Sequence, residues 1–206
     1  MANSTQSLIR EQIIKTGQIL AAKNLLPATS GNLSMRDLNT GIITITSSGK
    51  SKGQLSYDDF IEIDIDANLL NDSLLRPSAE TLLHTQLYQF FSEINTVIHV
   101  HSINSVVISK LYAKKRELKL KDYELLKALA GVKTHKHIET VPIFANTQNI
   151  KQLATEVNEY MKINPELHGY LIEGHGLYTW GTSQAEALRH VETFETLFEI
   201  ERKIWH

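Results

Sequence analysis

Apolar residues recur at helical spacing in several segments of the chain. Ile9, Ile13 and Leu20 are spaced so that they fall on one face of a helix, which predicts a first helix over residues 4–24. Similar stripes predict five further helices: one that Pro77 and Ser78 open, two over residues 103–112 and 122–130, one that begins at Thr147, and one that begins at Ser183.

Shorter runs rich in β-branched residues predict strands. Residues 33–36 and 42–46 flank Asn39-Thr40-Gly41, whose residue types favour a turn, so the two runs predict a hairpin. Further strands are predicted at residues 61–65, 96–101, 141–144, 170–172 and 177–180, with 141–144 at a sheet edge because of Pro142. Because strands come both as hairpins and between helices, we predict a layered α/β sandwich with a mixed, largely antiparallel sheet.

Composition narrows the possible chemistry. With 206 residues, 42% hydrophobic and 21% charged, the chain fits one globular domain over residues 1–206. The net charge of −2 provides no overall field for nucleic acid or an anionic membrane, so neither is expected as a partner. The absence of cysteine excludes disulfides and thiolate ligands, which leaves His, Asp and Glu to bind any metal.

Two further patterns bear on location and partners. Residues 1–10 lack the apolar core of a signal peptide, and no apolar run approaches the roughly 20 residues of a membrane span, so we expect a cytoplasmic protein. The charge run over residues 114–122 is mixed in sign and has no interleaved aromatic residue. We therefore interpret it as a solvated connection between helices rather than a nucleic-acid site.

Three histidines form a candidate metal site. On a strand, His99 and His101 project from the same face, although two such imidazoles can also form a plain hydrogen-bonded pair. His175 lies between Gly174 and Gly176, where another group could approach its ring closely, or where the chain simply makes a hairpin turn. Together the three histidines would make a set with open coordination positions, as in catalytic zinc sites.

The remaining histidines are interpreted differently. His135 and His137 have the same spacing as the candidate ligands, but a lysine separates them and the flanking segment is polar, which favours a surface pair. His84, His168, His190 and His206 are isolated in the sequence, so we expect structural roles for them.

Ser–Gly turns form candidate anion sites. Ser30-Gly31-Asn32 and Ser47-Ser48-Gly49-Lys50 each place polar donors beside a glycine, and Lys50 adds a positive charge. Ser78 lies at the start of a predicted helix, where it can bind an anion or only cap the helix. Glu80 and Glu124 also lie at predicted helix starts, where a carboxylate is favourable without any further role.

Five motifs together carry a resemblance to a known family. They are Pro27-Ala28-Thr29-Ser30-Gly31-Asn32, Ser48-Gly49-Lys50, Arg76-Pro77-Ser78-Ala79-Glu80-Thr81, His99-Val100-His101-Ser102 and Gly174-His175-Gly176-Leu177-Tyr178-Thr179-Trp180-Gly181. In this order and spacing the chain resembles the class II aldolase/adducin family over nearly its whole length. ETLLHTQLY at 80–88 and GHGLYTWG at 174–181 point to a branch of sugar-phosphate dehydratases.

The resemblance implies both a fold and a site. It implies a three-layer αβα sandwich, one zinc ion per subunit held by His99, His101 and His175, and a fourfold-symmetric homotetramer with sites near subunit interfaces. It also implies a small sugar phosphate as substrate. The residues implied to surround the phosphate are Asn32, Ser48, Gly49 and Ser78.

The acid/base residue has two candidates. Likeness to the eukaryotic dehydratases assigns the role to Glu124, in Tyr123-Glu124-Leu125-Leu126-Lys127, whereas likeness to the aldolases assigns it to Glu80. This chain lacks the cysteine that those dehydratases carry near the position of Glu80. Two other functions stay open: an aldolase or epimerase on the same fold, and a non-catalytic binding module like the adducin head.

Overall fold

One mixed sheet organises the molecule. The computed structural model describes residues 2–204, with side chains from residue 5 onward, so His206 lies outside the described residues. Its eight strands are β1 (Asn32–Arg36), β2 (Ile43–Thr46), β3 (Phe60–Ile63), β4 (Thr96–Val100), β5 (Glu117–Lys121), β6 (Ile138–Phe144), β7 (Gly169–Ile172) and β8 (Gly176–Gly181). They lie in the order β3-β2-β1-β4-β8-β7-β6-β5. Only the β6–β7 pair is parallel within the described residues, so the expected mixed, largely antiparallel sheet is confirmed.

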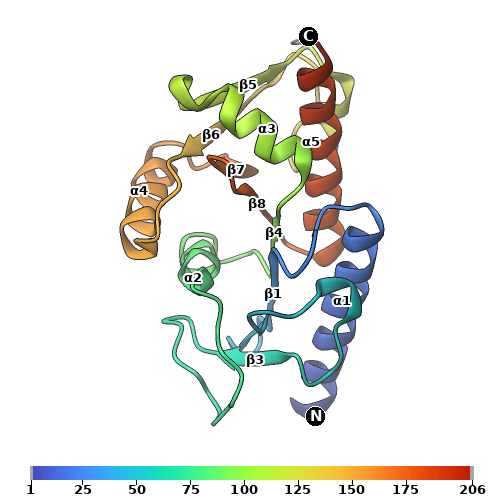
Figure 1. Cartoon of the computed structure of the whole chain (residues 1–206), viewed down its shortest axis with the longest axis vertical. Coiled ribbons are helices and arrows are strands. Elements are labelled where there is room, and N and C mark those ends of the chain that lie inside the picture. Colours follow the sequence, from blue (N-terminus) through green and yellow to red (C-terminus); the bar gives the residue numbers. More distant parts are fainter. Residues whose placement is uncertain (1, 205–206) are drawn as a thin grey trace.

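Helices cover both faces of the sheet, which gives the three expected layers (Figure 1). The helices on one face are α1 (Ala2–Ala22), α3 (Ile103–Leu111) and α5 (Gln184–Ile204). Those on the other face are α2 (Thr81–Phe90) and α4 (Ile150–Ile163). Three short 3₁₀ helices complete the set: η1 (Lys52–Gln54), η2 (Ala113–Lys115) and η3 (Glu124–Ala128). No described helix has the length and apolar character needed to cross a membrane.

Alternation along β4 separates the core from the candidate site. Ile98 and Val100 belong to the core beneath α1, α3 and α5. Val97 packs into the core beneath α2 and α4, and His99 projects from the same face of the strand as Val97. Ile98 and Val100 on one face and Val97 on the other therefore pack β4 into the core, so this packing does not depend on the His99 ring alone.

The charged segment after α3 departs from expectation. We expected residues 114–122 to be a solvated connection, but residues 117–121 form β5, the edge strand of the sheet. Leu118 and Leu120 are buried whereas Lys119 and Lys121 are exposed, which is the alternation of a half-buried strand. The charge run hid this period-two pattern, and charged edge strands are a common protection against strand pairing between molecules.

The position of β6 was also predicted wrongly. We expected a short edge strand because of Pro142, but β6 lies between β5 and β7. It pairs with β5 over residues 138–142 and with β7 only at Ile143 and Phe144. Pro142 stands where β6 changes from one partner to the other, so its missing N–H interrupts little of the pairing.

Two predicted helices differ in detail. The helix expected from Pro77 begins at Thr81, because the Ser78 hydroxyl accepts a hydrogen bond from the Glu80 backbone N–H at 3.2 Å and forms a separate turn. The segment expected as a helix over 122–130 forms only η3. Asp122, in the left-handed conformation with φ of 63°, immediately precedes it.

Gly176 sets the distance between the strands that carry the candidate ligands. A Cβ atom at this position would lie 2.0 Å from the Val100 carbonyl oxygen and 3.1 Å from Cε1 of His99. Only glycine lets β8 approach the end of β4 this closely.

We expect Gly176→Ala to lower the free energy of unfolding by more than about 3 kcal/mol, because backbone must move to admit the methyl group. The matched control is Gly41→Ala, where φ is +76° but nothing lies within 4 Å of the new Cβ, so only the left-handed strain of about 1–2 kcal/mol applies. Denaturant unfolding measures both. Equal losses in the two variants would contradict the close-approach argument.

Candidate metal centre

Four side chains converge at one end of the central strands. Each of Glu80, His99, His101 and His175 offers a ligand atom, and these atoms all lie within 4.8 Å of one another. His99 lies on β4, His101 directly follows it, His175 lies in the turn between β7 and β8, and Glu80 immediately precedes α2. The structure therefore brings together the three predicted histidines and adds Glu80, which the sequence had suggested as an acid/base or as a carboxylate at a helix start.

The spacing of these atoms fits a divalent cation. Nε2 of His99 lies 2.7 Å from Nε2 of His101 and 3.4 Å from Nε2 of His175. Oε1 of Glu80 lies 2.9 Å from Nε2 of His175 and 3.8 Å from Nε2 of His99. Ligands on a tetrahedral zinc at about 2.1 Å stand roughly 3.4 Å apart, so the observed separations bracket that value. Three imidazoles and one carboxylate are also a donor set that zinc accepts.

Neutral imidazoles face the centre of the cluster. Burial lowers the pKa of His99 well below its ordinary value and that of His101 to about 4. Nδ1 of His99 lies 3.0 Å from the Leu177 carbonyl oxygen, which can only accept, so this nitrogen carries the proton and Nε2 presents its lone pair. The His99 ring also stacks on Tyr178, with centroids 3.9 Å apart.

A buried chain of hydrogen bonds orients Glu80. Nδ2 of Asn32 donates to Oε2 of Glu80 at 2.6 Å, and Oδ1 of Asn32 accepts a hydrogen bond from Nε2 of His84. Nδ1 of His84 then accepts from the Ser34 hydroxyl at 2.7 Å. Burial opposes ionisation of Glu80, but His175, His99 and Asn32 outweigh it and hold the pKa of Glu80 well below its ordinary value. His84, expected to be structural, thus supports the candidate ligand Glu80 through Asn32.

A small cavity of about 130 Å³ opens beside this cluster. Of the predicted anion-binding residues, those that line it are Ser30, Gly31, Asn32, Ser47, Ser48, Gly49 and Ser78. Glu80 and His101 line it as well, so the cavity and the cluster share a wall. The φ of +77° at Gly49 is the left-handed conformation in which successive backbone N–H groups can turn toward an anion.

The predicted lysine is not among the lining residues. Nζ of Lys50 forms an ion pair with Asp59 at 2.8 Å, outside the cavity lining. Lys52 lines the cavity instead, together with Thr29, Thr46 and Ser47. The sequence offered both lysines in SGKSKG, but nothing in it showed which of them turns inward.

Glu124 lies apart from the cluster. It begins η3, its side chain is 70% exposed, and its contacts in the described chain are an ion pair with Lys127 and His135 at 3.8 Å. The hydrogen bond from Lys127 lowers the pKa of Glu124. Within one chain, the structure therefore brings Glu80 to the candidate ligands but does not bring Glu124.

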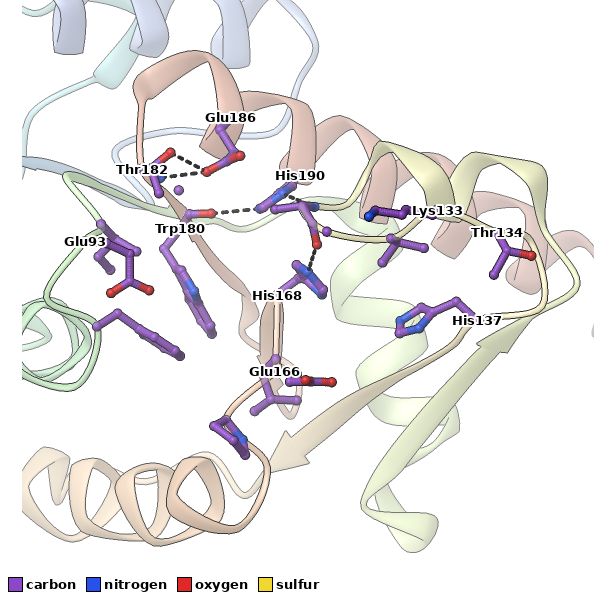
Figure 2. Close-up of a pocket in the computed structure, with 18 of the residues that line it drawn as sticks. Glu93, Lys133, Thr134, His137, Glu166, His168, Trp180, Thr182, Glu186 and His190 are labelled. Atoms are coloured by element: carbon purple, nitrogen blue, oxygen red, sulfur yellow. Dashed lines mark hydrogen bonds between the residues drawn. The ribbon is translucent and has the colours of Figure 1, made fainter.

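A larger cavity of about 720 Å³ lies at the opposite end of the central strands, beside the start of β7 and the end of β8 (Figure 2). Nδ1 of His168 lies 3.0 Å from the buried Glu139 carboxylate, and Nε2 lies 2.8 Å from the Ala130 carbonyl oxygen. Both partners only accept, so both ring nitrogens carry protons. Despite burial, Glu139 raises the pKa of His168.

His190 lies beside His168 and is neutral. Its Nδ1 donates to the Trp180 carbonyl oxygen at 2.8 Å, and its Nε2 accepts from the Ala130 N–H at 3.0 Å (Figure 2). Burial and the neighbouring His168 lower the pKa of His190 to about 4. His190 thus accepts from the backbone N–H of Ala130 and His168 donates to its carbonyl oxygen, which agrees with the structural roles expected for both histidines. His137 faces Glu139 at 2.8 Å, and neither it nor His135 joins the metal cluster.

A model of the class II aldolase and adducin N-terminal domain matches residues 11–201. The chain belongs to the class II aldolase and adducin family. Within this family, the chain is 48% identical over 202 residues to a methylthioribulose-1-phosphate dehydratase of Pseudomonas paraeruginosa, covering 98% of this chain and 97% of that protein. A protein of the same name from Azotobacter vinelandii is 48% identical over 200 residues, covering 97% of this chain and 96% of the relative.

Solved structures show the same architecture. An L-fuculose 1-phosphate aldolase, a class II aldolase by fold, superposes with a TM-score of 0.78 at 27% identity, covering 94% of this chain and 84% of that one. The resemblance inferred from the sequence motifs is confirmed, as is the expected α/β fold with a mixed central sheet.

We expect His99→Ala and His101→Ala each to lose bound metal while keeping the fold, because Ile98 and Val100 pack the other face of β4. Metal content per chain and circular dichroism measure the two effects. The matched control changes His135 and His137 together and should leave metal content intact. Full metal occupancy in either single variant would contradict the proposed ligand set.

Stability should depend on His190 between pH 6.5 and 4. The native pKa of about 4 lies below the ordinary 6.5, so the unfolded chain takes up a proton in this window that the native chain does not. The contribution, up to ~3 kcal/mol, is fully present above pH 6.5 and is lost as the pH falls toward 4. We expect His190→Gln to lower the number of protons taken up on unfolding at pH 5, measured from unfolding free energy against pH. The exposed His135→Gln serves as control; an unchanged proton uptake in His190→Gln would refute the assignment.

Proposed function

We propose that this chain is a methylthioribulose-1-phosphate dehydratase, an enzyme of methionine salvage. The observation that carries the proposal is the cluster of Glu80, His99, His101 and His175 beside a cavity lined with polar donors, which can hold a metal ion and an anion side by side. Relatives with this name match the chain at 48% identity over nearly its full length. The substrate is 5-methylthioribulose 1-phosphate, and loss of water between C3 and C4 gives 2,3-diketo-5-methylthiopentyl 1-phosphate.

We propose zinc as the metal, one ion per chain. When bound, it supplies Lewis-acid chemistry that draws electron density from the substrate's C2 and C3 oxygens and makes the C3 proton more acidic. His99, His101 and His175 hold it through ring nitrogens, with the pKa values of His99 and His101 lowered by burial, and Glu80 adds a carboxylate oxygen that Asn32 keeps in place. The low pKa of Glu80 suits a ligand better than a group that carries protons.

Proton transfer needs a further group. The base that removes the C3 proton can return it to the C4 hydroxyl, which then leaves as water, so one carboxyl group balances the reaction. We assign this role to Glu124 in preference to Glu80. In one chain Glu124 is exposed and its pKa is lowered, so the role requires burial in an assembly that raises its pKa.

This assignment is linked to a proposed homotetramer. An exposed Glu124 on η3 can complete the metal site of a neighbouring subunit, whereas in its own chain it contacts Lys127 and His135. In the same proposal, Asn32, Ser48, Gly49 and Ser78 surround the substrate phosphate and fix which carbons face the metal.

An aldolase or epimerase that acts on a sugar phosphate is the second candidate. The observation that favours it is the superposition on an L-fuculose 1-phosphate aldolase. A binding module like the adducin head is less well supported, because the full set of candidate ligands converges here.

The products distinguish the three functions. Zinc-loaded chain is incubated with 5-methylthioribulose 1-phosphate, and diketone and aldehyde are followed in parallel. The dehydratase forms diketone without aldehyde. Aldehyde without diketone would establish carbon–carbon cleavage in its place, and substrate binding with neither product would favour a binding module.

We expect Glu124→Gln to lower kcat by about 10²–10⁴-fold with a much smaller change in KM, because the amide keeps the shape of the side chain but cannot carry a proton. Zinc content should be unchanged in this variant. Glu80→Gln should instead lower zinc affinity, which metal titration measures. Loss of turnover in Glu80→Gln at full zinc occupancy, with an active Glu124→Gln, would reverse the two assignments.

A further inference from the structure

Lys52 is a buried cation at the wall of the small cavity. Its side chain lies in the lining, and the residue is only 3% exposed. Nζ donates to the carbonyl oxygens of Thr29 at 2.7 Å and of Lys50 at 2.9 Å. An ammonium group has three N–H bonds, so one N–H is left without a protein acceptor among the described residues.

Ser47 supplies a second unused donor at the same place. It is 1% exposed, it lines the same cavity, and its hydroxyl has no hydrogen-bond partner within the described chain. Its backbone N–H is already bonded to the Asp59 carbonyl oxygen at 2.9 Å, so the residue is firmly placed. A buried hydroxyl without a partner is costly in the free protein and gains from a ligand that accepts its hydrogen bond.

The positive charge of Lys52 also favours the binding of an anion at this wall of the cavity. Lys52 is the only lysine or arginine in the cavity lining, and among the described residues it forms no ion pair. Burial lowers the pKa of Lys52, whereas the charge of Glu80 raises it. The Glu80 carboxylate therefore helps to keep the Lys52 ammonium group charged. The Glu80 carboxylate already has partners of its own, because Oε1 lies 2.9 Å from Nε2 of His175 and Oε2 accepts a hydrogen bond from Nδ2 of Asn32.

We propose that Lys52 and Ser47 bind the phosphate group of the substrate, Lys52 as its fixed positive charge and Ser47 as a hydroxyl donor. This inference rests on the proposed function, because it takes the anion to be a sugar phosphate. The terminal oxygens of a phosphate accept several hydrogen bonds at once, and bonds between charged partners are the stronger ones. Lys52 therefore distinguishes a phosphorylated substrate from its unphosphorylated form.

The test compares Lys52→Gln with Lys50→Gln in the zinc-loaded full-length protein. Gln keeps an amide donor for the Thr29 carbonyl but carries no charge. The probe is inorganic phosphate. Its affinity for the protein is measured by calorimetry and by competition against substrate. We expect Lys52→Gln to weaken phosphate binding by tenfold or more, and Lys50→Gln to weaken it less. Lys119→Gln on β5 removes an equal charge far from the cavity and controls for net charge.

Ser47→Ala separates binding from structural support. Because the Ser47 hydroxyl has no partner among the residues that the structure describes, its removal should leave the thermal midpoint unchanged or raised while phosphate binding falls by about tenfold. A hydroxyl that only supported the fold would lower the midpoint and leave phosphate binding intact. This variant also decides the question if Lys52→Gln fails to fold.

Two results would overturn the proposal. One is phosphate affinity unchanged in both Lys52→Gln and Ser47→Ala, and the other is a larger loss in Lys50→Gln than in Lys52→Gln. Failure of the proposed function would be distinct, because phosphate would still bind through Lys52 and Ser47 while no diketone formed. In a parallel assay, Lys52→Gln should lower kcat/KM much less with dephosphorylated substrate than with the phosphorylated substrate.

Discussion

The hydrogen bond from Asn32 to Glu80 joins the two halves of the site. Asn32 begins β1 and pairs in register with His99 on β4, so its backbone is held against the strand that carries a candidate ligand. Its side chain bonds Glu80 and His84, and it lines the small cavity. The four candidate metal ligands and the small cavity therefore lie beside the same short stretch of sheet. A change at Asn32 would disturb both.

Local patterns in the sequence were enough for part of this site. The HxH spacing on a strand predicts that His99 and His101 share a face, and the glycines around His175 predict a turn that another group can approach. The proposed role of Glu80 as a fourth ligand could not be predicted in this way, because it depends on the packing of the segment before α2 against β1 and β4. Contacts between segments far apart in sequence leave no periodic signal.

The departures from expectation have different origins. Lys50 and Lys52 are equivalent by composition, and only the ion pair with Asp59 turns Lys50 away from the cavity. The alternation of Leu118 and Leu120 with lysines was a usable strand signal that the charge run obscured. Glu124 is a different case: its proposed role depends on a neighbouring subunit, which neither the sequence nor a single chain displays.

The proposed metal centre requires that Glu80, His99, His101 and His175 together hold one metal ion. X-ray absorption at the zinc edge of the zinc-loaded protein can test this, because imidazole rings give a characteristic outer-shell signal. We expect a four-coordinate ion in the resting protein, with three imidazole nitrogens and one carboxylate oxygen at about 2.0–2.2 Å. Fewer than three imidazoles, or a shell of oxygen atoms alone, would contradict it.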